Sequence, residues 1–311
     1  MEIKVFTWNV LSSAYFTADD YPEYDEEIFD IERKTKQVLE EVENMIRREY
    51  IIVLFEVCDV LMRRLIPLAL NLNYVVRDSY YNHPQSNNMG TVVMFPNHYA
   101  VLDYQQIVVG QLIKEEKDDK NEENEKNEKN EKKYSCANKI WNLFSTSNIE
   151  KTDVEEAKSK HNVMILVKLL NQNREFIIGA YHMPCAYRKP QVMKYHLETV
   201  WSICNEFSFS LSSPVILCTD MNTTPNDELY SYLPSKGMVS ANKFCMGKEP
   251  SYTTFTENKF MILPFQQTID YVWVSSKHIS QVIRFPVNNT DLLPSQSFPS
   301  DHLWLKFVLV F

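Results

Sequence analysis

The chain has 311 residues, 44% of them hydrophobic and 13% aromatic, which is enough to bury one large core, so we expect a single domain over residues 1–311. The formal net charge of −9 argues against a protein that coats nucleic acid, because such proteins neutralise phosphates with clustered lysine and arginine. An enzyme that acts on nucleic acid would rely on metal ions and local basic residues instead.

Apolar strand-like runs and two helical segments alternate along the chain. The predicted elements are, in chain order, strand Ile3–Trp8, helix Glu26–Arg48, strands Tyr50–Val57, Gly90–Phe95, Val163–Leu170 and Glu175–His182, helix Lys189–Phe207, and strands Pro214–Asp220, Thr268–Val274 and His302–Val310. Helices between two groups of strands predict an α/β fold in which two sheets pack face to face with helices outside. The chain has only five glycines, and neither a P-loop nor a dinucleotide-binding fingerprint is found.

One segment interrupts this pattern. Lys114–Lys133 consists only of lysine, glutamate, aspartate and asparagine, so it cannot contribute to a core and we expect it to be disordered. Strand-like sequence resumes at Asn162, which extends the expected charged insert over about 114–160. The insert is either a tolerated expansion of a surface loop or a tail that binds a partner.

Cysteine usage and apolar runs indicate the cellular setting. The six cysteines form no C-x-x-C pair, so neither a zinc site nor a compact disulfide framework is indicated, and we expect reduced, mostly buried thiols. No secretory signal precedes the first predicted strand. Apolar runs such as Ile51–Phe55 are far shorter than the roughly 20 residues that cross a bilayer. We therefore expect an intracellular protein, cytoplasmic or nuclear, that does not bind membranes.

Six short pieces of sequence, two of them considered as a pair, place a polar functional group at the end of an apolar strand, where loops form binding sites. They are Trp8-Asn9-Val10, Phe55-Glu56-Val57, Tyr181-His182-Met183, Thr219-Asp220-Met221-Asn222, and the pair Ile269-Asp270-Tyr271 with Ser300-Asp301-His302. Alone, each has an ordinary structural explanation, since Asn9 could end a strand, Glu56 start a helix and His182 be a satisfied core histidine. Their joint occurrence in this order indicates one active site.

Together the six pieces resemble the endonuclease/exonuclease/phosphatase (DNase I-like) superfamily. Family signatures of the type N-V-L, Q-E-V, T-H-L, G-D-x-N, I-D-Y and S-D-H align with them over nearly the whole chain. The sequences W-N-V-L, T-I-D-Y-V and P-S-D-H-L are most like the deadenylase, nocturnin and 2′-phosphodiesterase branch. The resemblance implies a four-layered α/β sandwich, with two mainly antiparallel sheets packed face to face, and metal-assisted phosphate hydrolysis.

The resemblance and the residue chemistry together predict a metal site. Glu56, helped by Asn9, offers hard oxygen ligands suited to Mg²⁺ or Mn²⁺, which keep waters and accept few protein ligands. By resemblance, Asp301 is a further carboxylate on the metal side or an orienting group.

The predicted catalytic set is His182, Asp220, Asn222, Asp270 and His302. Asp220 is expected to act as the base or to orient the attacking water, and Asn222 to donate to a phosphate oxygen. The two histidines can each donate to the phosphate. By resemblance, Asp270 is the partner of His302, and a carboxylate behind a histidine fixes its tautomer and favours its charged form.

Three residues depart from the family pattern without removing an essential group: Phe55 replaces Gln, Tyr181 replaces Thr, and Thr219 replaces Gly. The leading hypothesis is a 3′-to-5′ exoribonuclease, deadenylase-like, acting on single-stranded RNA. A DNA endonuclease, a tyrosyl-DNA phosphodiesterase, and a phosphatase acting on a dinucleotide or inositol phosphate stay open, because Y-H-M-P-C differs from the usual deadenylase sequence. A catalytically dead binding module is disfavoured, since the catalytic carboxylates and histidines are all present.

Residues that could bind the rest of a substrate are less specific. Arg188 and Lys189 follow the His182 strand and could meet an incoming phosphate chain, or could simply be a solvated helix start. Trp141, Tyr187, Tyr252 and Trp273 could stack on bases, but most of the 17 tyrosines and 17 phenylalanines must lie in the core or on ordinary surface. No base platform is assigned.

Overall fold

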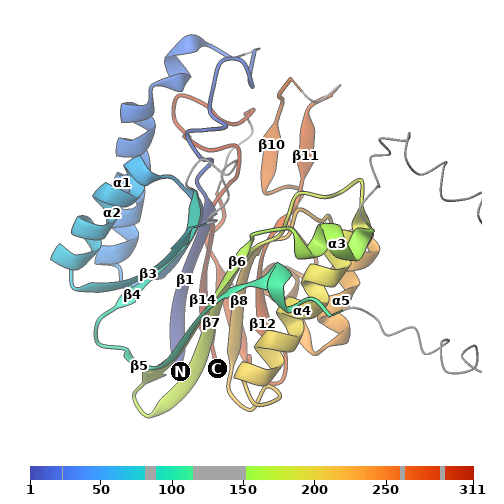
Figure 1. Ribbon diagram of the computed structural model, residues 1–311. Coiled ribbons are helices and arrows are strands. Elements are labelled where there is room, and N and C mark those ends of the chain that lie inside the picture. Colours follow the sequence, from blue (N-terminus) through green and yellow to red (C-terminus); the bar gives the residue numbers. More distant parts are fainter. Residues whose placement is uncertain (23, 81–88, 115–151, 260–262, 288–290) are drawn as a thin grey trace, which may run out of the picture.

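The computed structural model describes residues 1–22, 24–80, 89–114, 152–259, 263–287 and 291–311. Two six-stranded sheets pack against each other, and helices cover the outer face of each (Figure 1). The chain ends lie together at one end of the sandwich, where the Phe311 amide donates to the Met1 carbonyl (2.8 Å). The β10–β11 pair (Thr254–Thr256 and Phe265–Gln267) stands at the opposite end. The predicted α/β sandwich is confirmed.

The first sheet has the strand order β13-β14-β1-β2-β4-β3. Its strands are β1 (Glu2–Asn9), β2 (Ile51–Val57), β3 (Tyr74–Tyr80), β4 (Gly90–Pro96), β13 (Gln281–Arg284) and β14 (Leu305–Val310). β1 and β2 are parallel, and the other neighbouring strands are antiparallel. The parallel pair brings the carboxyl ends of β1 and β2 to one edge, where Asn9 lies beside Phe55.

The second sheet has the strand order β5-β6-β7-β8-β12-β9. Its strands are β5 (Ala100–Val108), β6 (Val163–Asn171), β7 (Arg174–His182), β8 (Val215–Asp220), β9 (Met238–Ser240) and β12 (Asp270–Ser275). Here β7 and β8 form the parallel pair, and His182 lies beside Asp220 at their carboxyl ends. Asp270 at the start of β12 lies opposite Asp220, because β8 and β12 are antiparallel.

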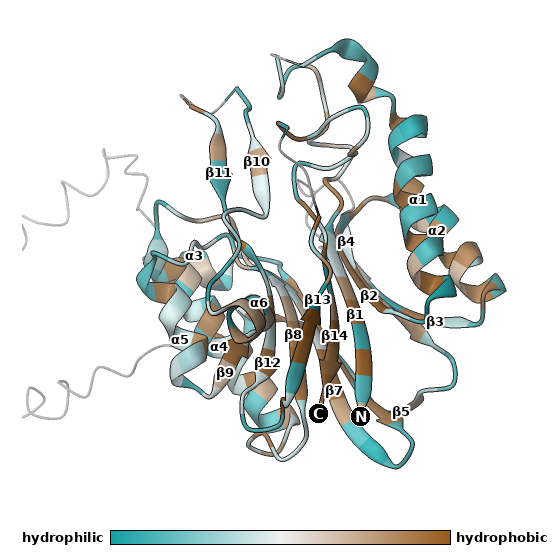
Figure 2. Ribbon diagram, turned by 180° about the vertical axis from the view of Figure 1, so that it is seen from behind, coloured by the Kyte–Doolittle hydropathy of each residue, from teal (hydrophilic) through white to brown (hydrophobic). Residues whose placement is uncertain are grey.

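The central strands are buried on both faces, which explains why their sequences are continuous apolar runs instead of an alternating pattern. β8 is buried along its whole length, and β2 is buried except at Glu56. Phe55, Phe176 and Phe307 belong to the core between the two sheets. One further core lies between each sheet and its helices. Figure 2 shows hydrophobic residues concentrated along the strands and on parts of the helices.

The helices form the two outer layers. α1 (Ile31–Arg47) and α2 (Asp59–Asn71) cover the first sheet, and α3 (Asp153–Lys158), α4 (Pro190–Phe207), α5 (Tyr232–Ser235) and α6 (Ala241–Met246) lie on the side of the second. The predicted helix Glu26–Arg48 is divided at Asp30, whose carboxylate accepts from the Glu32 and Arg33 amides and so caps α1. Residues Glu26–Phe29 form a separate 3₁₀ turn.

The charged insert lies mostly outside the described residues, but its C-terminal boundary differs from the expectation. Structure resumes before residue 160, because Asp153–Lys158 form α3. The Glu155 amide donates to the Thr152 hydroxyl (3.3 Å), and the Thr152 amide donates to the Glu155 carboxylate (2.9 Å). This capping box starts the helix, and Ala157 is buried against α4. The sequence analysis missed this helix because the high charge of the segment outweighed the T-x-x-E capping-box pattern at Thr152–Glu155.

Within the described ranges, no helix combines the length and the apolar composition needed to span a bilayer. The cysteines described there are free thiols, of which Cys204 and Cys218 are buried, Cys58 and Cys245 are half-buried and Cys185 is exposed. Fewer of them are buried than the sequence led us to expect.

Candidate active site

The predicted site residues converge at the end of the sandwich away from the chain termini. One cavity of about 460 Å³ opens there. Six of the eight predicted residues line it: Glu56, His182, Asp220, Asn222, Asp301 and His302. Asn9 and Asp270 are only 1% and 4% exposed and lie behind the lining, in contact with it. The sequence therefore predicted one site from six separate segments, and the fold brings these residues together.

Backbone irregularity turns Glu56 into the cavity. The pairing of β2 with β4 shifts register between Leu54 and Val57, and Glu56 adopts the left-handed region at φ 58°. For a residue with a side chain this conformation costs about 1–3 kcal/mol, which is typical of functional sites. Asn9 Nδ2 donates to Glu56 Oε1 (2.9 Å) and the Ser12 amide donates to Oε2 (3.0 Å). These two bonds fix the carboxylate.

Asn9 links the two sheets through its side chain. Its Nδ2 also donates to Asp220 Oδ2 (2.9 Å), and its Oδ1 accepts from the Leu11 amide (3.0 Å). In this structure Asn9 therefore orients the carboxylates of Glu56 and Asp220. The predicted contact of its oxygen with a metal ion stays a prediction.

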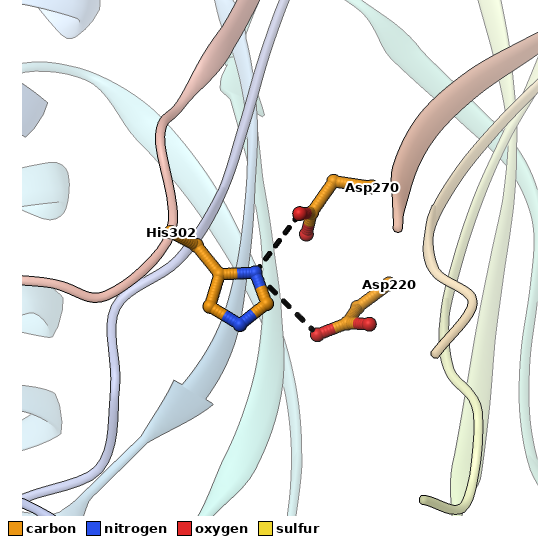
Figure 3. A group of neighbouring side chains, drawn as sticks. All are labelled: Asp220, Asp270 and His302. Carbon is orange, nitrogen blue, oxygen red and sulfur yellow. Dashed lines mark hydrogen bonds and ion pairs between the residues drawn. The ribbon is translucent and has the colours of Figure 1, made fainter. Parts of the chain in front are cut away.

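Asp270 and His302 form a buried pair, shown with Asp220 in Figure 3. His302 Nδ1 donates to Asp270 Oδ2 at 2.9 Å. The Thr253 hydroxyl donates to the same oxygen at 2.6 Å, which fixes the carboxylate behind the ring. Asp220 Oδ2 lies 3.9 Å from the same ring nitrogen. The partnership of Asp270 with His302 that the resemblance implied is present in the structure.

The charge state of His302 follows from its surroundings. Burial by itself lowers the pKa of the imidazole, but the charges of Asp270, Asp301 and Asp220 outweigh burial and raise the pKa of His302 well above its ordinary value. The surroundings therefore favour the charged imidazolium form of the ring. Its other nitrogen, Nε2, lies 3.9 Å from Asp301 Oδ1, which is too far for a hydrogen bond. Nε2–H can donate to a ligand in the cavity.

The Asp220 carboxylate lies next to the other polar groups that the second sheet brings to the cavity. His182 Nε2 lies 3.6 Å from Asp220 Oδ2, and the Asn222 amide donates to Oδ1 (3.1 Å). Asn222 adopts φ 47°, and its side-chain amide donates to the Met183 carbonyl (2.9 Å). A carboxylate held by two donors, the Asn9 side chain and the Asn222 amide, and open to the cavity can accept a proton from a bound water.

Glu56 and Asp301 form the part of the lining that fits a hard divalent cation. Asp301 Oδ2 accepts from the Tyr21 hydroxyl (3.1 Å), while its buried Oδ1 accepts no hydrogen bond from the residues described. Burial raises the pKa of Asp301, and the negative charge of Glu56 acts in the same direction. Such a carboxylate is stabilised as an anion by a nearby cation, and Mg²⁺ and Mn²⁺ prefer oxygen ligands of this kind.

A second group of potential ligands consists of Asp220, Asp270 and His302, whose ligand atoms all lie within 4.8 Å of one another. In this group Nδ1 of His302 already donates to Asp270. A protonated ring nitrogen cannot bind a metal ion, so the group is better suited to holding and moving a proton. Glu56 and Asp301 are then the lining carboxylates left as candidate ligands for a cation.

Three residues that contact the groups or segments forming the site were not predicted from the sequence: Tyr21, Thr253 and Lys34. Tyr21 and Thr253 lie in segments without periodic pattern, so the sequence carries no signal for them. For Lys34 the sequence does contain a signal. It lies on the buried stripe of α1, four residues before Val38 and eight before Val42, where a charged side chain is unexpected.

Beyond the cavity lies a groove of about 910 Å³ that shares Asn222 with it and is also lined by Tyr187, Arg188 and Lys189. Lys189 pairs with Glu156 (2.5 Å), as expected of a surface helix start. Arg188 lies 5.8 Å over the ring of the exposed Tyr187.

Of the other aromatics considered for stacking, Tyr252 and Trp273 do not line the groove. Trp273 is fully buried in the core, Tyr252 is half-buried against Phe255, and Trp141 lies outside the described residues.

No protein-family model matches the chain. Among curated proteins, Nocturnin of Mus musculus is 24% identical over 176 residues, which cover 52% of this chain and 40% of that relative. The match thus spans less than two thirds of the length of that curated relative.

Solved structures match over nearly the whole chain. The human Nocturnin catalytic domain with bound sulfate has a TM-score of 0.66 at 21% identity and covers 100% of this chain and 93% of its own. ANGEL2, a 2′,3′-cyclic phosphatase, has 0.69 at 13% identity, covering 99% and 95%. Truncated TDP2 of Caenorhabditis elegans has 0.62 at 13% identity, covering 100% and 98%. At these identities the likeness establishes the fold.

Proposed function

The chain has the endonuclease/exonuclease/phosphatase fold, and from this premise we propose that it is a divalent-metal-dependent phosphodiesterase. The observation that carries the proposal is the buried Asp270–His302 pair beside Asp220, in a cavity that Glu56 and Asp301 also line. Phosphodiester hydrolysis needs a base for the attacking water, positive charge at the phosphate, and a place for a hard cation. The cavity offers residues for each of these needs.

The metal-binding role falls to Glu56 and Asp301, which Asn9 and Tyr21 orient through hydrogen bonds. A bound Mg²⁺ or Mn²⁺ supplies positive charge to the phosphate and to the leaving oxygen.

The protein's own residues handle the protons. Asp220 accepts the proton of the attacking water, since its carboxylate is held by Asn9 and reaches the cavity. The His302 imidazolium donates through Nε2–H to a phosphate oxygen, and Asp270 keeps the ring charged and aimed. His182, whose ring lies beside Asp220, is placed to donate to the same phosphate. Asn222 lines the cavity and can donate to a phosphate oxygen once its amide leaves the Met183 carbonyl.

We further propose that the chain is a deadenylase-like exoribonuclease. Its substrate would be single-stranded RNA, which it would shorten from the 3′ end. The shared lining at Asn222 lets a chain continue from the cavity into the larger groove, which a substrate with one phosphate would leave unused. In that groove the Arg188 guanidinium can contact a phosphate, and the exposed Tyr187 ring can stack on a base. The likeness to the Nocturnin catalytic domain is consistent with this branch of the fold.

The test is a substrate panel with the purified protein in Mg²⁺ or Mn²⁺: 5′-labelled poly(A), mixed-sequence RNA, abasic DNA, a 5′-tyrosyl DNA, NADP and inositol phosphates. Stepwise shortening of the labelled RNA supports the proposal, and Asp220→Asn serves as the inactive control. Hydrolysis confined to DNA, to the dinucleotide or to an inositol phosphate overturns the RNA assignment and selects that alternative. Failure to hydrolyse any of them overturns the phosphodiesterase proposal.

A further inference from the structure

α1 buries a lysine that the reaction described above does not use. Lys34 is 6% exposed, and its ammonium donates to the carbonyl oxygens of Val10 and Pro299, both at 2.7 Å. The same nitrogen lies 4.5 Å from the centre of the Phe16 ring. Within the described part of the chain Lys34 makes no ion pair shorter than 4.0 Å, so its charge is satisfied by carbonyl dipoles and a ring face.

Burying an ammonium without a carboxylate partner is unfavourable, and lysine is seldom found so deep. Burial lowers the pKa of Lys34 to about 7, opposed by the charges of Asp301 and Glu56. An apolar residue at this position of the buried stripe would avoid the desolvation of a charge. The contacts of the ammonium therefore call for an explanation other than packing.

The two carbonyls that Lys34 binds belong to the two segments that carry the site. Val10 follows Asn9 at the end of β1, and Pro299 begins the Pro299-Ser300-Asp301-His302 sequence. These segments are 289 residues apart in the chain, and the ammonium joins them from a third element, α1. The Ser300 hydroxyl, which donates to the Asn9 carbonyl (2.6 Å), is a direct tie between the same two segments.

From these contacts we infer that Lys34 is a positioning residue, which sets the distance between the Asn9 segment and the Asp301–His302 segment by holding both to α1. It does not line the cavity, so it acts through the segments that it holds. A misplacement of about 1 Å between reacting groups can cost on the order of 10²-fold in rate. The catalytic consequence rests on the proposed phosphodiesterase function, whereas the positioning itself does not.

The experiment compares Lys34→Met, which keeps most of the length and loses the donors, with Lys34→Arg, which keeps the charge and N–H donors for both carbonyls. Lys36→Met is the matched control, since Lys36 lies two residues along on the same helix with a side chain that is 76% exposed. Amide hydrogen exchange is followed at Leu11 and His302, whose amides bond within the two segments, and at Ile165 in β6 as a distant reference.

In Lys34→Met, exchange at Leu11 and His302 should rise at least about tenfold while Ile165 is unchanged, because two segments loosen locally. Turnover should fall about tenfold or more with KM changed less than about twofold, since the residue does not contact substrate. Lys34→Arg should recover most of both losses, and Lys36→Met should show neither.

Two results overturn the inference: unchanged exchange at Leu11 and His302, or an equal rise at Ile165, which marks a general loss of stability. If Lys34→Met does not fold, Lys34→Gln, with a shorter donor, takes its place against Lys34→Arg, and equal exchange in these two variants counts against positioning. If the wild type hydrolyses no substrate, the proposed function fails, but the exchange measurement still decides the role of Lys34.

Discussion

Replacing Asp270 with asparagine removes one negative charge and little else. Asparagine keeps an oxygen at the position that accepts from His302 Nδ1 (2.9 Å) and from the Thr253 hydroxyl (2.6 Å). The ring can therefore stay in place while its charged form loses its main support. We expect turnover to fall heavily and the fold to survive.

The size of the loss follows from the 2.9 Å separation between Asp270 Oδ2 and His302 Nδ1. Two unit charges at that distance attract by about 6 kcal/mol at an effective dielectric constant of about 20. This value is an upper bound, because burial of both groups opposes their ionisation. Losing one preorganised electrostatic donor typically costs about 3–4 kcal/mol of barrier, or about 10²–10³ in rate. We expect a loss in that range.

The assay measures turnover and melting for Asp270→Asn, His302→Ala and the double variant at one pH. Because the two residues act as a unit, the double variant should be scarcely slower than His302→Ala alone. If Asp270 only capped local backbone, its substitution would lower the melting temperature and spare the activity per folded molecule. Independent, multiplicative losses in turnover would also refute the pair.

Three further predictions concern the metal site, the insert and pH. Glu56→Gln should abolish metal-dependent hydrolysis. It should shift the melting temperature by less than about 4 °C, since the amide keeps one acceptor for the Ser12 or Asn9 donor. Retained turnover would count against the metal role. Deleting residues 114–133 should leave turnover intact and lower the melting temperature by less than about 10 °C, because loop closure depends weakly on length; a larger drop would make the insert structural. His302 has a raised folded pKa, so its contribution to stability is complete below about pH 6.5, its unfolded pKa, and is lost as pH rises through the folded value. In EDTA, the advantage in melting temperature of the wild type over Asp270→Asn should therefore shrink with rising pH in calorimetry, and a widening gap would reverse the assigned sign.

Much of the central architecture could be predicted from the sequence, because strands buried on both faces produce unmistakable apolar runs. β2, β6 and β7 match their predicted ranges to within one residue at each end. The polar groups that follow these runs stand out for the same reason, which is why Glu56 and His182 could be placed at one site. Parallel pairing then brings strand ends together without any further signal.

The elements that were missed have weaker local signals. β5 is exposed along most of its length at the edge of the second sheet, so it lacks an apolar run. α2 contains Pro67, which normally argues against a helix interior. The predicted strand His302–Val310 begins only at Leu305, because His302 belongs to the loop that presents it to the cavity.

Apart from the Asp270–His302 pair, which the resemblance implied, contacts between distant side chains could not be predicted. Thr253 reaches Asp270, and Tyr21 reaches Asp301, across 17 and 280 residues of sequence. Neither contact depends on periodicity, so only the folded chain reveals it. The resemblance supplied the site residues that the fold brings together, but the groups that orient them came from the structure.

The most direct test of the proposed function is the dependence of phosphodiester hydrolysis on a hard cation at this site. The purified protein is stripped with EDTA, assayed on labelled single-stranded RNA, and assayed again after Mg²⁺ or Mn²⁺ is returned, with Glu56→Gln in parallel. We predict no hydrolysis in EDTA, recovery with either cation for the wild type, and none for Glu56→Gln. Full activity in EDTA, or equal recovery in the variant, would contradict the proposed metal-dependent phosphodiesterase.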